Sequence, residues 1–147
     1  MARILATDGL DSECVEILLE KGHHVDMTHF ERSELLQGAI SGYDVIIIRS
    51  ATKLDSEVLT ANASRKSRIR LIVRAGVGLD NIDLEKASEL GIMVKNTPTA
   101  STKAVVEFTI GHLLSGVRNI SKADRAMRSS EWSKKSSSGT ELSGKNL

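Results

Sequence analysis

The sequence has one cysteine, one proline, and only 3% aromatic residues among its 147 positions. The single Cys14 cannot form an internal disulfide, and no Cys or His lies at the spacing that a cysteine-based zinc site needs. We therefore predict that Cys14 lies on a helix, with its side chain packed in the protein core. The four histidines also lack a metal-site spacing, so we predict no metal: His23, His24, His29 and His112.

The sequence also lacks an excess of charge of one sign and a long hydrophobic run. Its 20 Lys and Arg oppose 19 Asp and Glu, which excludes the strong net charge that recruits nucleic acid or anionic membranes. No window approaches the roughly 18 apolar residues that span a bilayer, and the first residues do not resemble a signal peptide. We therefore predict a cytoplasmic protein without nucleic-acid or membrane partners.

The first hundred residues contain short β-branched runs that alternate with helical periods. This alternation is typical of βα units, and runs that are apolar at consecutive positions indicate strands covered on both faces. Asp11 or Ser12 is expected to cap the first helix, and Thr52 with Asp55 fits a capping box. We predict a doubly wound parallel α/β sheet of about five strands, at residues 3–6, 24–28, 45–48, 69–73 and 92–94.

The pattern changes at Ser101 to a longer helix, either continuous or broken once before Arg128. Apolar residues recur on one stripe of this helix. Residues 129–138 then contain six serines and predict an irregular arm, in which Trp132 needs an apolar pocket. We divide the chain accordingly into residues 1–99 and 100–147.

Candidate ligand-binding residues follow the third and fourth predicted strands. Arg49 and Ser50 come after one, and the segment 74–78, Arg-Ala-Gly-Val-Gly, comes after the other. Guanidinium groups and glycine backbones suit a small molecule with two anionic groups, at the sheet edge where such folds bind ligands. The same residues would equally fit a tight turn with arginines in surface ion pairs.

Asn96 follows the fifth predicted strand, where its amide could orient a ligand, although Asn is also a common turn residue. No G-x-G-x-x-G follows any strand, because residues 75–81 contain only a G-x-G. The dinucleotide-binding fingerprint is therefore missing from these residues.

Three segments together resemble the D-2-hydroxyacid dehydrogenase family: 48–53, 73–83 and 96–98. The resemblance extends over the chain and includes Glu107, Trp132, 139–142 and 144–145. It implies a flavodoxin-like substrate-binding domain at 1–99, followed by the connecting helix and dimerisation arm of a nucleotide-binding domain at 100–147. In this family the glycine fingerprint for NAD would follow within a few residues, so we expect the front part of a longer enzyme.

The resemblance also implies roles for individual residues. The backbone of Ala75, Gly76 and Val77 would cradle the substrate carboxylate. The other predicted substrate-binding residues are Arg49, Ser50, Arg74 and Asn96 on the phosphate side, with Lys134 reaching the partner subunit's site. Thr102 would lie beside the cofactor, NAD. The family's catalytic Arg, Glu and His would lie beyond residue 147, so we assign no catalytic residue here.

The expected function is that of an NAD-dependent dehydrogenase acting on a phosphorylated hydroxy acid, which the run 49–53 favours. We expect a homo-oligomer through residues 101–135 and no turnover by this chain alone. Within the family, a hydroxypyruvate or glyoxylate reductase and a transcriptional corepressor are alternatives. A non-catalytic anion-binding module is another. A phosphoreceiver is disfavoured, because the third strand ends at Arg49 rather than at an acceptor Asp and only Asp8 follows the first.

Overall fold

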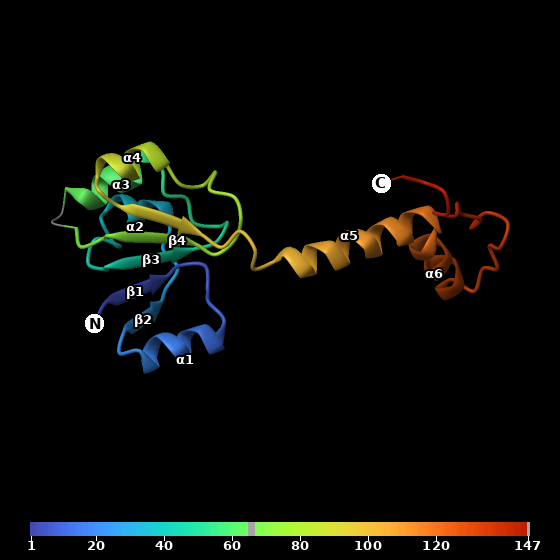
Figure 1. Cartoon of the computed structure of the whole chain (residues 1–147), viewed down its shortest axis with the longest axis horizontal. Coiled ribbons are helices and arrows are strands. Elements are labelled where there is room, and N and C mark those ends of the chain that lie inside the picture. Colours follow the sequence, from blue (N-terminus) through green and yellow to red (C-terminus); the bar gives the residue numbers. More distant parts are fainter. Residues whose placement is uncertain (65–66, 147) are drawn as a thin grey trace. The chain divides into compact units, whose positions relative to one another are not determined.

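The computed structural model describes residues 1–64 and 67–146, and the chain divides into two compact units, Met1–Ala100 and Ser101–Leu147. The boundary lies one residue beyond the division that the sequence suggests. The first unit contains the whole β-sheet, and the second contains helices and an irregular arm (Figure 1).

The sheet of the first unit is parallel throughout, with strand order β2-β1-β3-β4-β5. This is the flavodoxin-like order, so the predicted fold class is confirmed. The strands are β1 (Arg3–Ala6), β2 (His24–Met27), β3 (Val45–Ile48), β4 (Leu71–Arg74) and β5 (Met93–Asn96). The last two begin later than predicted, because Ile69 and Ile92 are buried just before the strands and read as strand residues in the sequence.

Four helices accompany the sheet: α1 (Ser12–Glu20), α2 (Arg32–Leu36), α3 (Ser56–Ala63) and α4 (Leu84–Glu89). Asp11 caps α1 by accepting a hydrogen bond from Glu13 N, which confirms one prediction. The predicted capping box was wrong, because Asp55 itself is the N-cap of α3 and accepts from Val58 N. Thr52 is instead buried, and its hydroxyl contacts Thr7 and Asp8.

The core of the first unit joins one face of the sheet to residues of α2, α3 and α4. Its fully buried strand residues include Leu5, Ile46 and Ile72. Helix α1 contains no buried residue and packs through the half-buried Val15 and Leu18. Cys14 is exposed, so its predicted place in a helix core was wrong.

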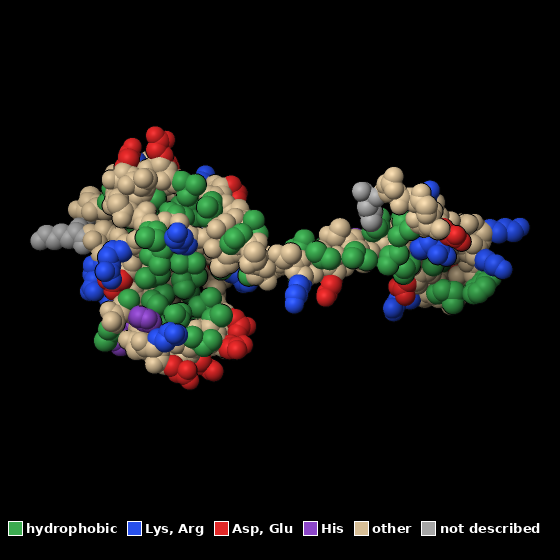
Figure 2. Space-filling model, viewed as in Figure 1, with side chains coloured by type: hydrophobic (Ala, Val, Ile, Leu, Met, Phe, Trp, Pro, Cys, Tyr) green, Lys and Arg blue, Asp and Glu red, His purple; other side chains and the backbone are tan. Residues whose placement is uncertain are grey.

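The opposite face of β3, β4 and β5 is only partly covered. Val45, Ile47, Leu71 and Val73 alternate with buried neighbours and are half-buried, and Met93 is 57% exposed. Figure 2 shows hydrophobic side chains gathered over the strands of this unit. Strands β3 and β4 therefore have buried residues on the face toward α2, α3 and α4 and only half-buried residues on the other face.

The second unit contains α5 (Thr102–Val117), α6 (Ile120–Arg128) and the arm that follows. The helices are separated at Asn119, which has a left-handed φ of 54°, so of the two alternatives that the sequence left open, the single break is the one present. The arm is fastened to the helices through Thr140 N, which donates to Val117 O at 2.7 Å, and Asn119 Nδ2, which donates to Ser138 O at 2.7 Å. Neither helix has a buried residue.

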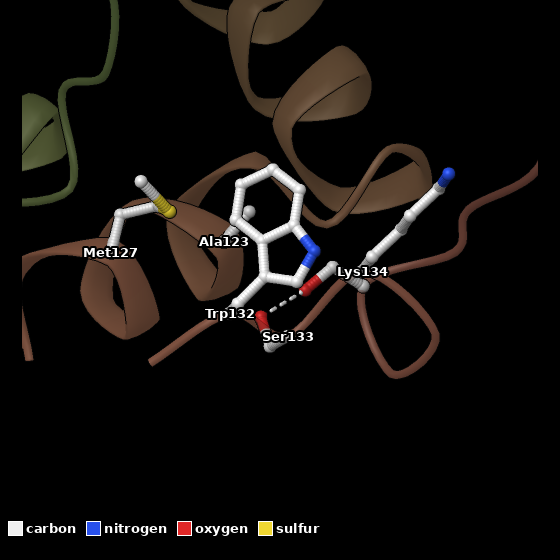
Figure 3. Close-up of a pocket in the computed structure, with 6 residues that line it drawn as sticks. Ala123, Met127, Trp132, Ser133 and Lys134 are labelled. Atoms are coloured by element: carbon white, nitrogen blue, oxygen red, sulfur yellow. Dashed lines mark hydrogen bonds between the residues drawn. The ribbon is translucent and has the colours of Figure 1, made fainter. Parts of the chain in front are cut away.

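Trp132 lies in the arm of the second unit and does not fill a pocket. It lines an open pocket of about 360 Å³ together with Met127 and Lys134, and its own exposure is 79%. Figure 3 shows the indole ring between these two side chains. Within the described ranges, no helix is long and apolar enough to cross a membrane.

Candidate functional site

The loops that follow β1, β3, β4 and β5 meet at one edge of the first unit, because all strands of the sheet are parallel. Figure 1 shows the arrowheads of the strands pointing to this edge. Ile48 pairs in register with Arg74, so Arg49 leaves the sheet beside the loop that begins at Ala75. The carboxyl edge of a parallel sheet is where α/β folds bind ligands.

The carboxylate of Asp8, directly after β1, holds the turn that follows β3. Its Oδ2 atom accepts from Arg49 N at 2.7 Å and from Thr52 N at 3.0 Å, and its Oδ1 atom accepts from Thr52 Oγ1 at 2.5 Å and Thr7 Oγ1 at 3.3 Å. Burial raises the pKa of the Asp8 carboxyl, but hydrogen bonds from Thr52, Arg49 and Thr7 outweigh this effect and hold the pKa below its usual value. Asp8 is therefore an ionised acceptor beneath the turn.

Asn81, in the loop after β4, holds the same turn from another side. Its Nδ2 atom donates to Arg49 O at 2.8 Å and to Thr52 O at 2.7 Å. Its backbone O accepts from Leu54 N at 2.8 Å, beside the bridge between Leu54 and Ile82. The backbone of Arg49 and Thr52 is thus bonded both to a carboxylate and to an amide.

Sequence reasoning did not assign a site role to Asp8 or Asn81. Asn81 lies inside one of the segments that carry the family resemblance, and Asp8 was considered only for a phosphoreceiver. The missing signal was the strand order: once β1 and β4 are placed on either side of β3, polar residues just beyond them become candidates for contact with the β3 turn.

The loop after β4 brings Arg74 over Gly76. A Cβ atom at Gly76 would lie 2.6 Å from Arg74 Cζ, so the guanidinium would have to move, and the φ of 156° at Gly76 is one that residues with a side chain rarely adopt. Arg74 Nε is buried and has no hydrogen-bond partner among the described residues. The planar Arg74 guanidinium therefore lies beside Gly76 in the predicted carboxylate cradle.

Two of the three predicted cradle N–H groups are already bonded within the chain. Ala75 N donates to Ile48 O at 2.8 Å, and Gly76 N donates to Arg74 O at 2.9 Å. Val77 N has no acceptor in the part of the chain that the structure describes. Asn96 Nδ2 donates to Val77 O at 2.7 Å, which connects the end of β5 to the cradle. Val77 N is therefore the available donor of the cradle.

The structure thus brings seven of the nine predicted residues to one edge of the first unit; they are Arg49, Ser50, Arg74, Ala75, Gly76, Val77 and Asn96. The remaining two belong to the second unit. Thr102 is the first residue of α5, and Lys134 lies beside Trp132. Their roles stay predictions. No group of three or more His, Cys, Asp or Glu side chains able to hold a metal ion occurs within the described ranges.

A flavodoxin-like sheet whose carboxyl edge presents cations and unpaired N–H groups is an arrangement typical of α/β domains that bind ligands. The family described as "D-isomer specific 2-hydroxyacid dehydrogenase, catalytic domain" matches residues 4–143. The chain therefore belongs to the D-isomer specific 2-hydroxyacid dehydrogenase family, which confirms the resemblance found in the sequence.

Two relatives match essentially the whole chain. A hydroxypyruvate reductase of Thermotoga maritima is 40% identical, over 99% of this chain and 46% of the relative. A D-3-phosphoglycerate dehydrogenase of Methanocaldococcus jannaschii is 41% identical, over 100% of this chain and 27% of the relative. The chain thus spans less than half the length of these relatives.

Solved structures agree with this family. A Thermus thermophilus protein superposes with a TM-score of 0.83 at 28% identity, covering 97% of this chain and 46% of that one. An NAD⁺-bound 3-phosphoglycerate dehydrogenase of Entamoeba histolytica superposes with a TM-score of 0.67 at 32% identity, covering 80% of this chain and 39% of that one. The fold of the first unit is therefore one that family members use.

Proposed function

We propose that this chain is the substrate-recognising part of an NAD-dependent D-3-phosphoglycerate dehydrogenase. Such an enzyme oxidises 3-phosphoglycerate to 3-phosphohydroxypyruvate, the first step of serine synthesis. The observation that carries the proposal is the pair of arginines, Arg49 and Arg74, at the ends of neighbouring strands. A substrate with a carboxylate and a phosphate would supply two anions to this edge, and guanidinium groups bind such anions through charge-assisted hydrogen bonds.

The proposed division of contacts follows the donors at the edge. Val77 N would bind the carboxylate, and Arg74, whose Nε is buried and unpaired among the described residues, would bind an adjacent anion. Arg49 and Ser50, both exposed, would bind the phosphate, with Asn96 holding the cradle. The bound anion would also offer a hydrogen-bond acceptor to the buried Nε atom of the half-buried Arg74.

The second unit is proposed to serve assembly and the cofactor. Residues 101–135 would form a homo-oligomer, in which Lys134 reaches the partner subunit's site and Thr102 lies beside NAD. None of the 147 residues forms a G-x-G-x-x-G fingerprint, so we propose that dinucleotide binding and hydride transfer need residues outside this sequence. We also propose a cytoplasmic location for this metabolic enzyme.

Calorimetric titration of the chain with 3-phosphoglycerate, D-glycerate and inorganic phosphate tests the proposal. We expect 3-phosphoglycerate to bind more tightly than either smaller anion, and both Arg49→Ala and Arg74→Ala to weaken it by about tenfold or more. The matched control is Arg70→Ala, because Arg70 is exposed just before β4, at the opposite edge of the sheet. Equal affinity for D-glycerate and 3-phosphoglycerate would contradict a phosphorylated substrate.

A second assay addresses turnover. The purified chain with NAD and 3-phosphoglycerate should produce no reduced cofactor, as followed by absorbance at the NADH band. Genuine turnover would show that these residues alone suffice for chemistry.

Hydroxypyruvate reduction is the second candidate function, and the 40% identical Thermotoga maritima relative favours it. This alternative predicts that hydroxypyruvate, which has no phosphate, binds at least as well as 3-phosphohydroxypyruvate. Comparison of the two keto acids in the same titration therefore separates the candidates.

A further inference from the structure

The turn from Arg49 to Thr52 is held at both of its ends by side chains from two other loops. Asp8 accepts from the N–H groups of Arg49 and Thr52, and Asn81 donates to the carbonyl groups of the same two residues. We propose that Asp8 and Asn81 are positioning residues that give the site its preference for a phosphorylated substrate by fixing this turn. The inference rests on the proposed function, in which Arg49 and Ser50 bind the phosphate.

The hydrogen bonds leave the middle of the turn free. The N–H groups of Ser50 and Ala51 have no acceptor among the residues that the structure describes, and both residues are exposed. A turn whose ends are bonded and whose central N–H groups are unpaired is preorganised for an anion, because consecutive backbone N–H groups form anion-binding concavities. Fixing the ends also limits the positions that the Arg49 side chain can reach.

The contacts span three neighbouring strands. Asp8 follows β1, the turn follows β3, and Asn81 lies in the loop after β4, while β3 lies between the other two strands in the sheet. The turn is therefore held between the loops on its two sides. A movement of either loop would change the conformation of the turn, which is what a positioning role requires.

The charge of Asp8 argues for geometry rather than electrostatic attraction. A carboxylate beneath an anion site would repel phosphate, yet its side chain is only 4% exposed and receives hydrogen bonds from Arg49, Thr52 and Thr7. Burying a charge is unfavourable unless such bonds compensate it. The role of the carboxylate is thus to hold these donors in place. Asn, its neutral isostere, should therefore be able to replace Asp8.

The hydrogen bonds of Asn81 also point to a role in holding the turn. Its Oδ1 atom is buried without a hydrogen-bond partner among the described residues, whereas its Nδ2 atom makes two short bonds to the turn. An unpaired buried acceptor is unfavourable. The amide is therefore present at this position for its N–H groups.

The first test needs no ligand. In Asp8→Ala and Asn81→Ala, amide hydrogen exchange at Arg49 and Thr52 should be about tenfold faster than in the unchanged chain, because one side of the turn is released. The matched control is Asp83→Ala, which removes the side-chain cap of α4, where Asp83 accepts from Lys86 N at 2.9 Å. The Asp83 backbone N donates to Leu54 O, a bond that the substitution keeps, and the side chain makes no hydrogen bond to residues 49–52 in the described structure. Unchanged exchange in both variants of the turn would overturn the inference.

The second test measures the ratio of the dissociation constants for D-glycerate and 3-phosphoglycerate. This ratio should fall about tenfold in Asp8→Ala, and Asp8→Asn should restore it, since the amide can accept from the backbone and donate to the threonine hydroxyls. Asp83→Ala should lower the melting temperature without changing the ratio. If Asp8→Ala leaves this ratio unchanged, the positioning role is wrong and the proposed function still stands. An unchanged chain that does not prefer 3-phosphoglycerate would overturn the proposed function and, with it, the assigned role.

Discussion

In the first unit, the side chains of Leu5, Ile46 and Ile72 are fully buried, whereas in the second unit Phe108 and Trp132 are 69% and 79% exposed. The first unit closes a core between a sheet and helices. The second has two helices and an arm with no buried residue in either helix. Leaving an apolar surface in water costs about 25 cal/mol per Å². The difference indicates that the first unit is stabilised by its own core, whereas the helices of the second unit bury little apolar surface within the described residues.

Polar interactions follow the same division. In the first unit, the Thr52–Thr7 pair and Asn62 make buried hydrogen bonds that link distant parts of the chain. In the second unit, the ion pair between Arg128 and Asp124 is exposed and joins positions four residues apart. Exposed ion pairs contribute little to stability. The first unit therefore has both the apolar core and the polar network that a specific site requires.

The largest expected effect comes from the core of the first unit. Ile72→Ala removes a side chain that is fully buried in the central part of the sheet and should lower the free energy of unfolding by about 2–5 kcal/mol. Leu114→Ala, at a position of α5 that is 41% exposed, should cost far less in the isolated chain. Urea unfolding followed by circular dichroism measures both. Similar losses in the two variants would show that the units do not differ in this way.

The next prediction compares alanine substitutions at two glycines, one in each unit. Gly76 has a φ of 156°, which a residue with a side chain rarely adopts, and the Cβ of Gly76→Ala would also displace the Arg74 guanidinium. We therefore expect a destabilisation of about 1–3 kcal/mol and loss of 3-phosphoglycerate binding. Gly111→Ala, inside α5 and with no atom within 4 Å of the added Cβ, should stabilise by about 0.5–1 kcal/mol. Thermal unfolding and calorimetry test the pair. Normal ligand binding by Gly76→Ala would contradict the described cradle.

A smaller effect concerns self-association through the exposed residues of the second unit. Phe108→Ser should weaken concentration-dependent association by about tenfold, since it removes an exposed apolar side chain. Cys14→Ser, at an exposed position of the first unit, is the control and should have no effect. Sedimentation velocity over a range of concentrations provides the measurement. If the unchanged chain stays monomeric at high concentration, the expected assembly through residues 101–135 is wrong.

The smallest effect is a pH dependence of the first unit. The pKa of Asp8 is lowered because hydrogen bonds from Thr52, Arg49 and Thr7 outweigh the opposing effect of burial. An unfolded Asp has a pKa of about 3.9, so this stabilisation is present above about pH 4 and is lost as the pH falls through the lower folded value. Asp8→Asn should reduce the loss of stability on acidification. Parallel curves for the two proteins below about pH 4 would show that Asp8 does not contribute to the acid sensitivity.

Most of the secondary structure could be predicted from local patterns. The strands at 3–6 and 45–48 have the predicted bounds, and Asp11 caps α1 as expected. Cys14 was misplaced, because an apolar period on a helix predicts a buried stripe without showing how much of it the neighbouring sheet covers. Thr52 was misplaced because a short hydroxyl side chain can cap a helix or join a buried network, and the choice depends on which residues lie nearby.

The candidate site could be predicted only in part. Arg49 and Arg74 were found because both follow apolar runs, and the carboxyl ends of parallel strands meet at one edge. The engagement of Ala75 N and Gly76 N within the chain could not be found this way. It depends on the path of the loop and on the Arg74 side chain, which no sequence pattern describes.

The sequence by itself determined the alternation of strands and helices, the change of character at Ser101 and the segments that identify the family, because each depends on residues close together in the chain. Only the tertiary structure decided that Asp8 contacts Arg49, 41 positions away, and that Asn81 holds the same turn. The physical reason is the strand order. Placing β3 between β1 and β4 brings three loops within hydrogen-bonding distance, and no local pattern encodes which loops become neighbours.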